Sequence, residues 1–194
     1  MVFIVRLYMG GLALFLVCSS SIQAHEFTYS AGVSILTVDD AESDTLGSTS
    51  GFSPFSLAYS DRVHRDTRYV VELFQGGGTI SSSSRLVGQK VSYQGIGIGY
   101  QQRFRVTRTF KPWAGAGLEY VATEYRDRHM VDSDGFLQQR FSNRQEDGVN
   151  LALQAASYWD WNRDWRVGIN TKLSHPLSKD LRIFHVGLSV VYDL

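Results

Sequence analysis

The segment Phe184–Leu194, with the sequence FHVGLSVVYDL, places a large apolar residue at every second position. Successive side chains of a β-strand point to opposite faces, so a period of two predicts a strand with two different faces. Phe184 and Tyr192 belong to the apolar face, whereas His185 and Ser189 belong to the other. The segment therefore predicts a β-strand whose two sides meet different surroundings.

The same alternation recurs along the chain towards the N-terminus. In residues 27–35, for example, Phe27 and Tyr29 alternate with Thr28 and Ser30. Repeated short segments of this kind, separated by polar stretches, predict an all-β protein. We expect eight strands, at residues 27–35, 55–60, 69–74, 95–103, 113–120, 149–158, 165–173 and 184–194.

The connections between the expected strands differ in length. Longer polar stretches follow the first, third, fifth and seventh strands, and tighter turns follow the others. Outer-membrane barrels show this asymmetry, with long loops outside and short turns in the periplasm, so both chain ends are expected on the periplasmic side. The longest stretch is residues 126–147. We expect Gly76-Gly77-Gly78 to lie in a flexible loop, because no Lys-Ser/Thr pair and helix follow it as in a phosphate-binding loop.

Residue size favours a membrane barrel over a soluble one. Large Phe, Tyr, Leu and Trp residues lie on one face of the expected strands, and Gly, Ala and Ser predominate on the other. An eight-stranded barrel has room inside only for modest side chains, so the bulky face is expected to point to lipid. Aromatic residues also gather near strand ends, as in the girdles of outer-membrane barrels. We predict an antiparallel, eight-stranded, transmembrane up-and-down β-barrel, with a soluble lipocalin-like barrel as the alternative.

Residues 1–24 have the three regions of a secretory signal peptide. Arg6 supplies the positive charge, residues 10–17 form a short apolar core, and Ser21-Ile22-Gln23-Ala24 offers a cleavage point. The apolar core is too short for a transmembrane helix, which needs about 20 apolar residues. We therefore expect an exported chain, with the outer-membrane barrel domain at residues 25–194.

Composition excludes several classes of function. The chain carries 19 Lys and Arg residues against 19 Asp and Glu residues, and the two signs are intermixed, so no nucleic-acid partner is expected. The one cysteine, Cys18, lies in the expected signal peptide, which leaves no disulfide and no cysteine-ligated metal in the mature domain. Asp132 and Asp134 do not have the spacing of a calcium loop. We expect neither a cofactor nor a metal site.

Two segments carry a family resemblance. Residues 110–120, FKPWAGAGLEY, are similar to a strand of small outer-membrane barrels of the OmpX/OmpW/OmpA type. Residues 186–194 are similar to the C-terminal signal that those proteins present to the barrel-assembly machinery, with Leu194 in place of the usual terminal Phe. The resemblance implies residence in the cell outer membrane, with lipid, lipopolysaccharide and the assembly machinery as partners. It selects no activity, because adhesins, serum-resistance factors, channels and lipid A-modifying enzymes share this scaffold.

Several polar residues fall on the small-residue face, which is expected to line the barrel interior. Buried charges have to be paired. One interpretation is a salt-bridge network that fills and stiffens the interior, and the other is a narrow route for ions or small apolar solutes. The expected interior network consists of Glu72, Arg103, Glu119, Asn150, Gln154, Arg166 and Lys172, and His185 falls on the same face.

The longest connection, residues 126–147, mixes charged and aromatic side chains. One interpretation is a contact site for a host ligand, a partner protein or lipopolysaccharide phosphates, and the other is a solvated loop without a binding role. The candidate contact residues are Arg126, Arg128, His129, Asp132, Asp134, Phe136, Arg140, Phe141 and Arg144. Our leading hypothesis is a non-enzymatic barrel that acts through its external loops in surface interaction, adhesion or envelope integrity.

Two alternative functions remain open. The polar interior and the likeness to OmpW suggest a narrow channel. A lipid A-modifying enzyme is less favoured: lipid A deacylase barrels use a Ser and a His with an acid partner, whereas Ser174 and His175 are adjacent here. Adjacent strand residues face opposite ways, so the two side chains are expected to lie outside the reach that a proton transfer needs.

Overall fold

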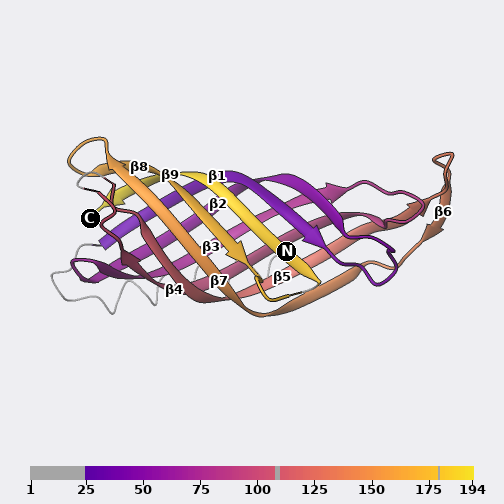
Figure 1. Ribbon diagram of the computed structural model, residues 1–194, viewed down its shortest axis with the longest axis horizontal. Helices are drawn as coiled ribbons and strands as arrows, with labels where there is room; N and C mark the ends of the chain where they lie inside the picture. The colour runs from indigo at the N-terminus through magenta and orange to yellow at the C-terminus, as the bar shows by residue number, and fades with distance from the viewer. Residues whose placement is uncertain (1–24, 108–109, 179) are drawn as a thin grey trace, which may run out of the picture.

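The computed structural model describes residues 25–107, 110–178 and 180–194, so the expected signal peptide lies outside the described residues (Figure 1). In these ranges, no helix has the length and apolar character needed to cross a membrane. The strands are β1 (His25–Val38), β2 (Gly47–His64), β3 (Thr67–Ile80), β4 (Gly88–Arg103), β5 (Trp113–Val131), β6 (Leu137–Arg140), β7 (Arg144–Asp160), β8 (Trp165–Ser174) and β9 (Leu181–Asp193).

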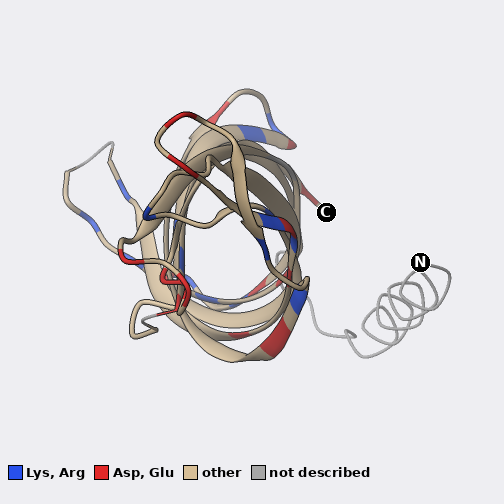
Figure 2. Ribbon diagram, turned by 90° about the vertical axis from the view of Figure 1, so that its right-hand side faces the viewer, with Lys and Arg blue, Asp and Glu red and all other residues tan. Residues whose placement is uncertain are grey.

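Eight of these nine strands close into an antiparallel barrel. Around the ring the order is β4-β3-β2-β1-β9-β8-β7-β5, and pairing between β4 and β5 closes it. Seen along the barrel, the strands form an oval ring around a lumen (Figure 2). The short strand β6 pairs with the far end of β5 and lies outside the ring. The predicted eight-stranded up-and-down barrel is confirmed, and every expected strand overlaps one of the eight.

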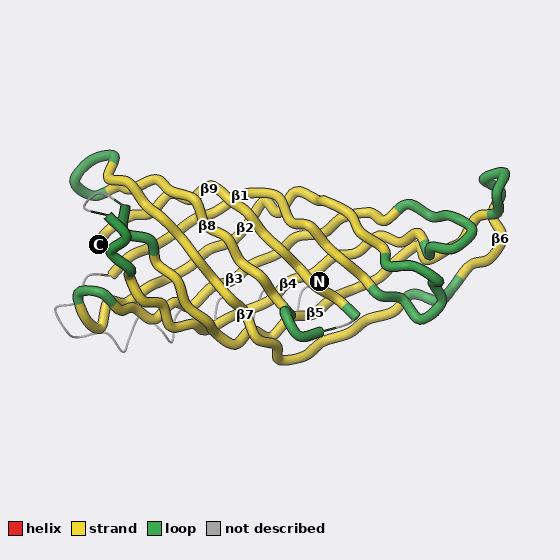
Figure 3. The backbone as a smooth tube through the Cα atoms, viewed as in Figure 1, coloured by secondary structure: helices red, strands yellow, loops and turns green. Residues whose placement is uncertain are grey.

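The two ends of the barrel are built differently. At the terminal end, which holds both ends of the described chain, the Leu194 amide donates a hydrogen bond to the His25 carbonyl at 2.9 Å. At the opposite, hairpin end, β5, β6 and the start of β7 project beyond the other strands (Figure 3). The expected alternation of loop lengths holds only in part. Residues 104–112, between β4 and β5 at the terminal end, form a longer connection than residues 175–180 at the hairpin end. The Phe104 amide donates to the Pro112 carbonyl at 2.8 Å, so the ends of this longer connection are held together.

Strands extend further towards the hairpin end than the sequence pattern indicated. β5 has 19 residues and β7 has 17, whereas about 9 to 11 residues cross a bilayer. The expectation of one long loop at residues 126–147 was wrong, because this stretch contains the end of β5, all of β6 and the start of β7. The expectation that Gly76-Gly77-Gly78 lies in a flexible loop was also wrong. Gly77 pairs with Ser92 inside a continuous β3–β4 ladder, where a Cβ on Gly77 would lie 2.5 Å from the Val91 carbonyl oxygen.

Large apolar side chains cover the outside of the barrel, as predicted. Their alternation with buried neighbours follows the strand period; in β9, for example, every second residue from Leu181 is buried. A soluble barrel would point this face inward, so the arrangement is that of a barrel facing lipid. The outward apolar residues include Tyr29, Val33, Ile35, Tyr69, Ile96, Ile98, Tyr100, Leu118, Tyr120, Leu151, Leu153, Ile169, Val186, Leu188 and Val190.

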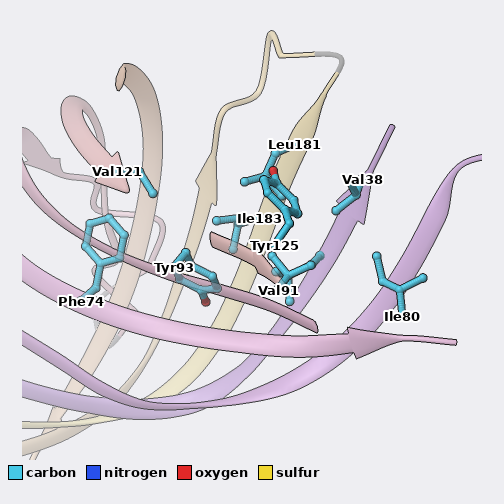
Figure 4. Close-up of a cluster of buried hydrophobic side chains, with 10 residues drawn as sticks. Val38, Phe74, Ile80, Val91, Tyr93, Val121, Tyr125, Leu181 and Ile183 are labelled. Carbon is cyan, nitrogen blue, oxygen red and sulfur yellow. The ribbon is translucent and has the colours of Figure 1, made fainter. Parts of the chain in front are cut away.

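The lumen is not lined by small and polar residues throughout. Near the hairpin end, inward side chains from five strands form an apolar cluster inside the barrel (Figure 4). The cluster fills the space between opposite walls with close-packed side chains, and such interiors hold little empty volume. We call it the lumen cluster; its members are Leu36, Val38, Phe74, Ile80, Val91, Tyr93, Val121, Tyr125, Leu181 and Ile183.

Candidate functional site

A buried lysine holds the centre of the lumen. The Lys172 ammonium of β8 lies 3.0 Å from Oε2 of Glu72 on β3 and 3.6 Å from Oε2 of Glu119 on β5. It also lies 3.2 Å from the centre of the Phe74 ring, where the negative face of the aromatic ring attracts a cation. One positive charge therefore lies between two buried carboxylates at the edge of the lumen cluster.

A chain of hydrogen bonds leads from this centre towards the terminal end. Gln154 Nε2 donates to Glu72 Oε2 at 3.3 Å, and Gln101 Nε2 donates to Gln154 Oε1 at 2.7 Å. Arg68 then donates to Gln101 Oε1 from both Nε and an Nη atom, at 2.9 and 2.7 Å. Ser56 on β2 also donates to Glu72. Together with Lys172 and Glu119, the polar side chains of six strands thus form one connected network.

A second charge cluster closes the terminal end of the lumen. Glu26 is fully buried and forms ion pairs with Arg68 at 2.9 Å, with Arg166 at 3.0 Å and with Arg62. Arg166 also pairs with Asp193 at 2.5 Å. Three guanidinium groups around one carboxylate neutralise a charge that would otherwise be too costly to bury.

The expected interior residues divide between these clusters and two other places. Four of them, Glu72, Glu119, Gln154 and Lys172, form the central network, and Arg166 belongs to the Glu26 cluster. Arg103 is the last residue of β4 and bonds Asp66 in the β2–β3 turn at 2.9 to 3.0 Å, outside both clusters. The hydrogen bond from Arg103 and the charge of Arg105 hold the Asp66 pKa below its usual value of 3.8 despite some desolvation. Asn150 Nδ2 donates to the Gly148 carbonyl two residues away, at 3.3 Å, rather than to a member of either cluster among the described residues.

Sequence reasoning missed several members of the two clusters, among them Glu26, Arg68 and Gln101. Glu26 and Arg68 each lie one residue before an expected strand, at residues 27–35 and 69–74, and were left out of it, whereas both lie in strands. The signal was present: Glu26 is in phase with Thr28 and Ser30, and Arg68 is in phase with Glu72. Continuing each alternation by one step would have placed them inside the barrel.

Ser174 and His175 are placed differently from the expectation. Both side chains are buried, and His175 Nε2 lies 3.8 Å from Glu119 Oε1. The backbone explains this, because β8 ends at Ser174 and His175 adopts a left-handed conformation with φ of 57°. The rule that adjacent residues face opposite ways therefore does not apply here. The contacts of the two described residues nevertheless include no hydrogen bond between Ser174 and His175.

The base of the projecting hairpin is fixed by a buried ion pair. Arg128 of β5 donates to both carboxylate oxygens of Asp40, at 2.9 and 3.0 Å, and to Glu42 at 2.6 Å. It also donates to the Ser142 carbonyl at 2.9 Å and lies 5.6 Å from the Phe141 ring centre. Burial alone would raise the Asp40 pKa, but hydrogen bonds from Glu42 and Arg128 and the Arg128 charge together lower it below 3.8.

The tip of the hairpin is an ordered turn with exposed apolar side chains. Asp132 Oδ1 accepts hydrogen bonds from the amides of Asp134 and Phe136, at 3.0 and 2.8 Å. Gly135 supplies the φ of 85° that this turn requires, since glycine has no Cβ to clash there. Phe136 and Leu137 are 70% and 52% exposed. A fixed backbone thus presents two large apolar residues outward.

The candidate contact residues therefore have different roles. Arg128, Asp132 and Phe141 hold the hairpin together, and Arg144 pairs with Glu146 next to the Tyr125 ring. Arg126 pairs with Glu124 at 2.7 Å, and His129 Nδ1 lies 2.6 Å from the Asp127 carbonyl oxygen. Asp134, Phe136 and Arg140 remain exposed near the tip.

No protein-family model matches the sequence, and no curated protein matches it either. Solved structures do match. Neisserial surface protein A superposes with a TM-score of 0.56 at 16% identity, covering 87% of this chain and 97% of that one. The outer membrane protein OprG from Pseudomonas aeruginosa gives 0.56 at 12% identity, covering 89% and 97%. Ail, the attachment invasion locus protein of Yersinia pestis, gives 0.54 at 14% identity, covering 89% and 99%.

This chain has the fold of a small bacterial outer-membrane barrel. At identities this low the likeness concerns the fold alone, so the roles of individual residues in this outer-membrane barrel follow only from its own geometry. In the described parts of the barrel, no three His, Cys, Asp or Glu side chains are grouped so that they could hold a metal ion.

Proposed function

We propose that this outer-membrane barrel is a non-enzymatic protein that makes contacts at the cell surface through the tip of its projecting hairpin. The observation that carries the proposal is the exposure of Phe136 and Leu137 on an ordered turn that stands clear of the barrel (Figure 1). Exposed apolar groups at the end of a rigid element are typical of binding surfaces. Arg140, at the other end of β6 from Leu137, adds an exposed positive charge to the same hairpin.

The hairpin is built to hold its shape. Arg128 is only 5% exposed and ties β5 to the β1–β2 connection through Asp40. The lumen cluster packs directly inside the same end of the barrel, so the strands that carry the hairpin have a solid support. A partner would therefore meet a preformed surface, which lowers the entropic cost of binding.

A transport role fits the lumen less well. Conduction through a barrel needs a polar path from one end to the other, but the lumen cluster occupies the hairpin end with apolar side chains. In the middle, Lys172 of β8 pairs with Glu72 on the opposite wall and lies near Glu119 of β5, which is separated from β8 only by β7. An enzymatic role has less support still, because Ser174 and His175 lack the hydrogen bond that a nucleophile and its base require.

The remaining parts of the proposal concern location. We place the hairpin end outside the cell and the terminal end in the periplasm, with residues 1–24 as the signal peptide and the β9 sequence as the signal for the barrel-assembly machinery. Lipid and lipopolysaccharide would surround the apolar belt. Two similar structures bear names consistent with a surface role, Neisserial surface protein A and the attachment invasion locus protein Ail, and Ail was solved with the heparin analogue sucrose octasulfate.

The test compares adhesion of bacteria that display the wild-type protein with bacteria that display the double variant F136S/L137S. Binding is counted on epithelial cell monolayers and on heparin-coated plates. We expect the double variant to adhere about tenfold less, since buried apolar anchors carry most of the energy of such contacts. The matched control is L177S, because Leu177 is 84% exposed in the β8–β9 connection at the same end.

Equal adhesion of F136S/L137S and wild type on every surface would overturn the proposal, as would an equal loss in L177S. Heat-modifiable gel mobility confirms that each variant is folded. Deleting the whole hairpin, residues 128–145, would not test the tip separately. This deletion also removes the Arg128 anchor and strand residues of β5 and β7, so a loss of adhesion could come from a disturbed barrel.

A further inference from the structure

The outer wall of the barrel carries a groove that the hairpin does not explain. It has a volume of about 580 Å³ and crosses β3, β4, β5 and β7 on the hairpin side of the apolar belt. This volume lies in the usual range of about 300–1,000 Å³ for small-molecule sites. The outside of a barrel is generally convex, so a hollow of this size needs a local cause.

Strand register supplies that cause. Gln75 on β3 pairs with Gln94 on β4, Gln94 pairs with Ala122 on β5, and Ala122 pairs with Asp147 on β7. Paired residues of adjacent strands point to the same face, so these four side chains form one outward row. Ala122 is the smallest member and stands between long neighbours. The row is therefore low in its middle and high on both sides.

A second polar row lies one step further towards the hairpin end. Ser92 pairs with Glu124, and Glu124 pairs with Gln145. The Gln145 amide donates to Glu124 Oε1 at 3.2 Å, which fixes both side chains. Arg126 pairs with Glu124 from the side of the hairpin. The groove thus has a floor of small residues and walls of amide, hydroxyl and carboxylate groups.

The row on the other side of the groove is apolar and belongs to the lipid-facing belt. Ile96 pairs with both Leu73 and Tyr120, and Tyr120 pairs with Val149. The Tyr120 hydroxyl donates to Asp147 Oδ2 at 2.5 Å, so its ring stays at the boundary between the rows. Two residues of a strand span about 7 Å, which places the polar rows directly beside the hydrocarbon edge, at the depth of lipid headgroups.

We propose that this groove binds a neutral saccharide, namely the sugar headgroup of a glycolipid in the adjacent leaflet. Amide and carboxylate oxygens accept hydrogen bonds from sugar hydroxyls, and amide NH2 groups donate to them. Phe52 and Tyr120 line the apolar border, where aromatic rings contact the C–H faces of sugars. The described lining residues include Glu124, Glu146 and Asp147 but no Lys or Arg, and the Arg126 guanidinium next to the groove is already paired with Glu124, so phosphate and sulfate groups are disfavoured.

The experiment uses the barrel refolded in phosphatidylcholine nanodiscs, where both leaflets carry the probe and membrane orientation does not matter. One sample contains digalactosyldiacylglycerol as a minor lipid, and another receives free maltohexaose. NMR follows the backbone amide of Ala122, the side-chain amide of Gln94 and nuclear Overhauser contacts from sugar protons to the Tyr120 ring. We expect changes at all three positions with the glycolipid.

The decisive variant is A122L, which fills the floor of the groove from outside the barrel. Its matched control is A116L, because Ala116 also points outward on β5 but lies in the lipid belt. We expect A122L to weaken glycolipid binding about tenfold and A116L to leave it unchanged, since only the former removes the pocket volume. Changes with maltohexaose alone would assign the groove to free sugars and overturn the glycolipid assignment. No change with either probe, or equal loss in both variants, would overturn the site itself.

Discussion

Lys172 and Glu72 form an ion pair of 3.0 Å across the lumen, between strands that lie on opposite sides of the ring. Three strands of the ring lie between β3 and β8 in either direction, so this contact is not a neighbour contact within the sheet. It fixes the width of the barrel at its centre. Both side chains are buried, so breaking this ion pair costs far more stability than breaking a pair at the surface.

Replacing Lys172 by Met should strongly destabilise the barrel. The variant leaves Glu72 and Glu119 facing each other without a cation, and breaking a buried pair in this way costs about 3–5 kcal/mol. Urea unfolding from lipid vesicles, followed by tryptophan fluorescence, measures the change. The control is K90M, since Lys90 on β4 is exposed. Equal unfolding midpoints for K172M and K90M would show that the central pair does not contribute. The triple variant K172M/E72Q/E119Q should recover part of the loss.

The hairpin anchor should weaken in acid. The Asp40 pKa is lowered below 3.8, so its ion pair with Arg128 contributes fully above 3.8 and is lost as the pH falls through the lowered value. Carboxyl 13C NMR of Asp40 measures this titration directly, and 15N relaxation of Met130 reports hairpin motion. D40N should show the mobile hairpin already at neutral pH. A titration midpoint above 3.8 would contradict the buried pair.

Substitution by Val should have different effects on refolding at two glycines that lie in strands. A Cβ on Gly115 would lie 1.9 Å from the Tyr100 carbonyl oxygen, whereas a Cβ on Gly148 would meet no atom within 4 Å. G115V should therefore abolish refolding, because the β4–β5 ladder would have to move apart. G148V should refold with wild-type yield. Gel mobility with and without heating measures both, and efficient refolding of G115V would show that this ladder is spaced differently.

The lumen cluster should contribute to stability like the core of a soluble protein. Leu36 is fully buried, so L36A should cost about 2–5 kcal/mol, as for other buried Leu to Ala changes. I35A, on the lipid side of the same strand, serves as the control because Ile35 is 45% exposed. Urea midpoints compare the two. A smaller loss in L36A than in I35A would contradict a packed lumen.

Alternation was enough to predict the eight strands and the outward direction of their apolar faces. Tyr29, Ile98 and Leu188 point outward as their positions in the alternation indicate, because the residues that face lipid are apolar in every strand. The strand ends were not predicted. Beyond the lipid belt both faces of β5 become mixed, with Tyr125 buried and Arg126 exposed, and the pattern looks like a charged loop.

The contents of the lumen were predicted only where they are polar. Glu72 and Lys172 stood out as charges on a small-residue face, but Phe74 and Ile183 on the same inward face were not recognised as filling. Small side chains were expected inside, because an eight-stranded barrel is narrow. Large inward residues fit near the hairpin end because glycines leave space beside them: a Cβ on Gly78 would lie 3.4 Å from Leu36, and a Cβ on Gly95 would lie 2.6 Å from Phe74. Pairing across the ring, which brings Lys172 of β8 to Glu72 of β3, is a tertiary property that no local pattern contains.

We therefore propose that the barrel is a closed scaffold: its lumen is filled, and its function depends on contacts made by its surface. Planar-bilayer recording of the refolded protein tests it most directly, with only heat-modifiable preparations used. We expect no unitary current steps from the wild type, because the lumen cluster and the Lys172 bridge between Glu72 and Glu119 occupy the path. Reproducible unitary steps whose size changes in K172M would contradict the claim and identify the lumen as a channel.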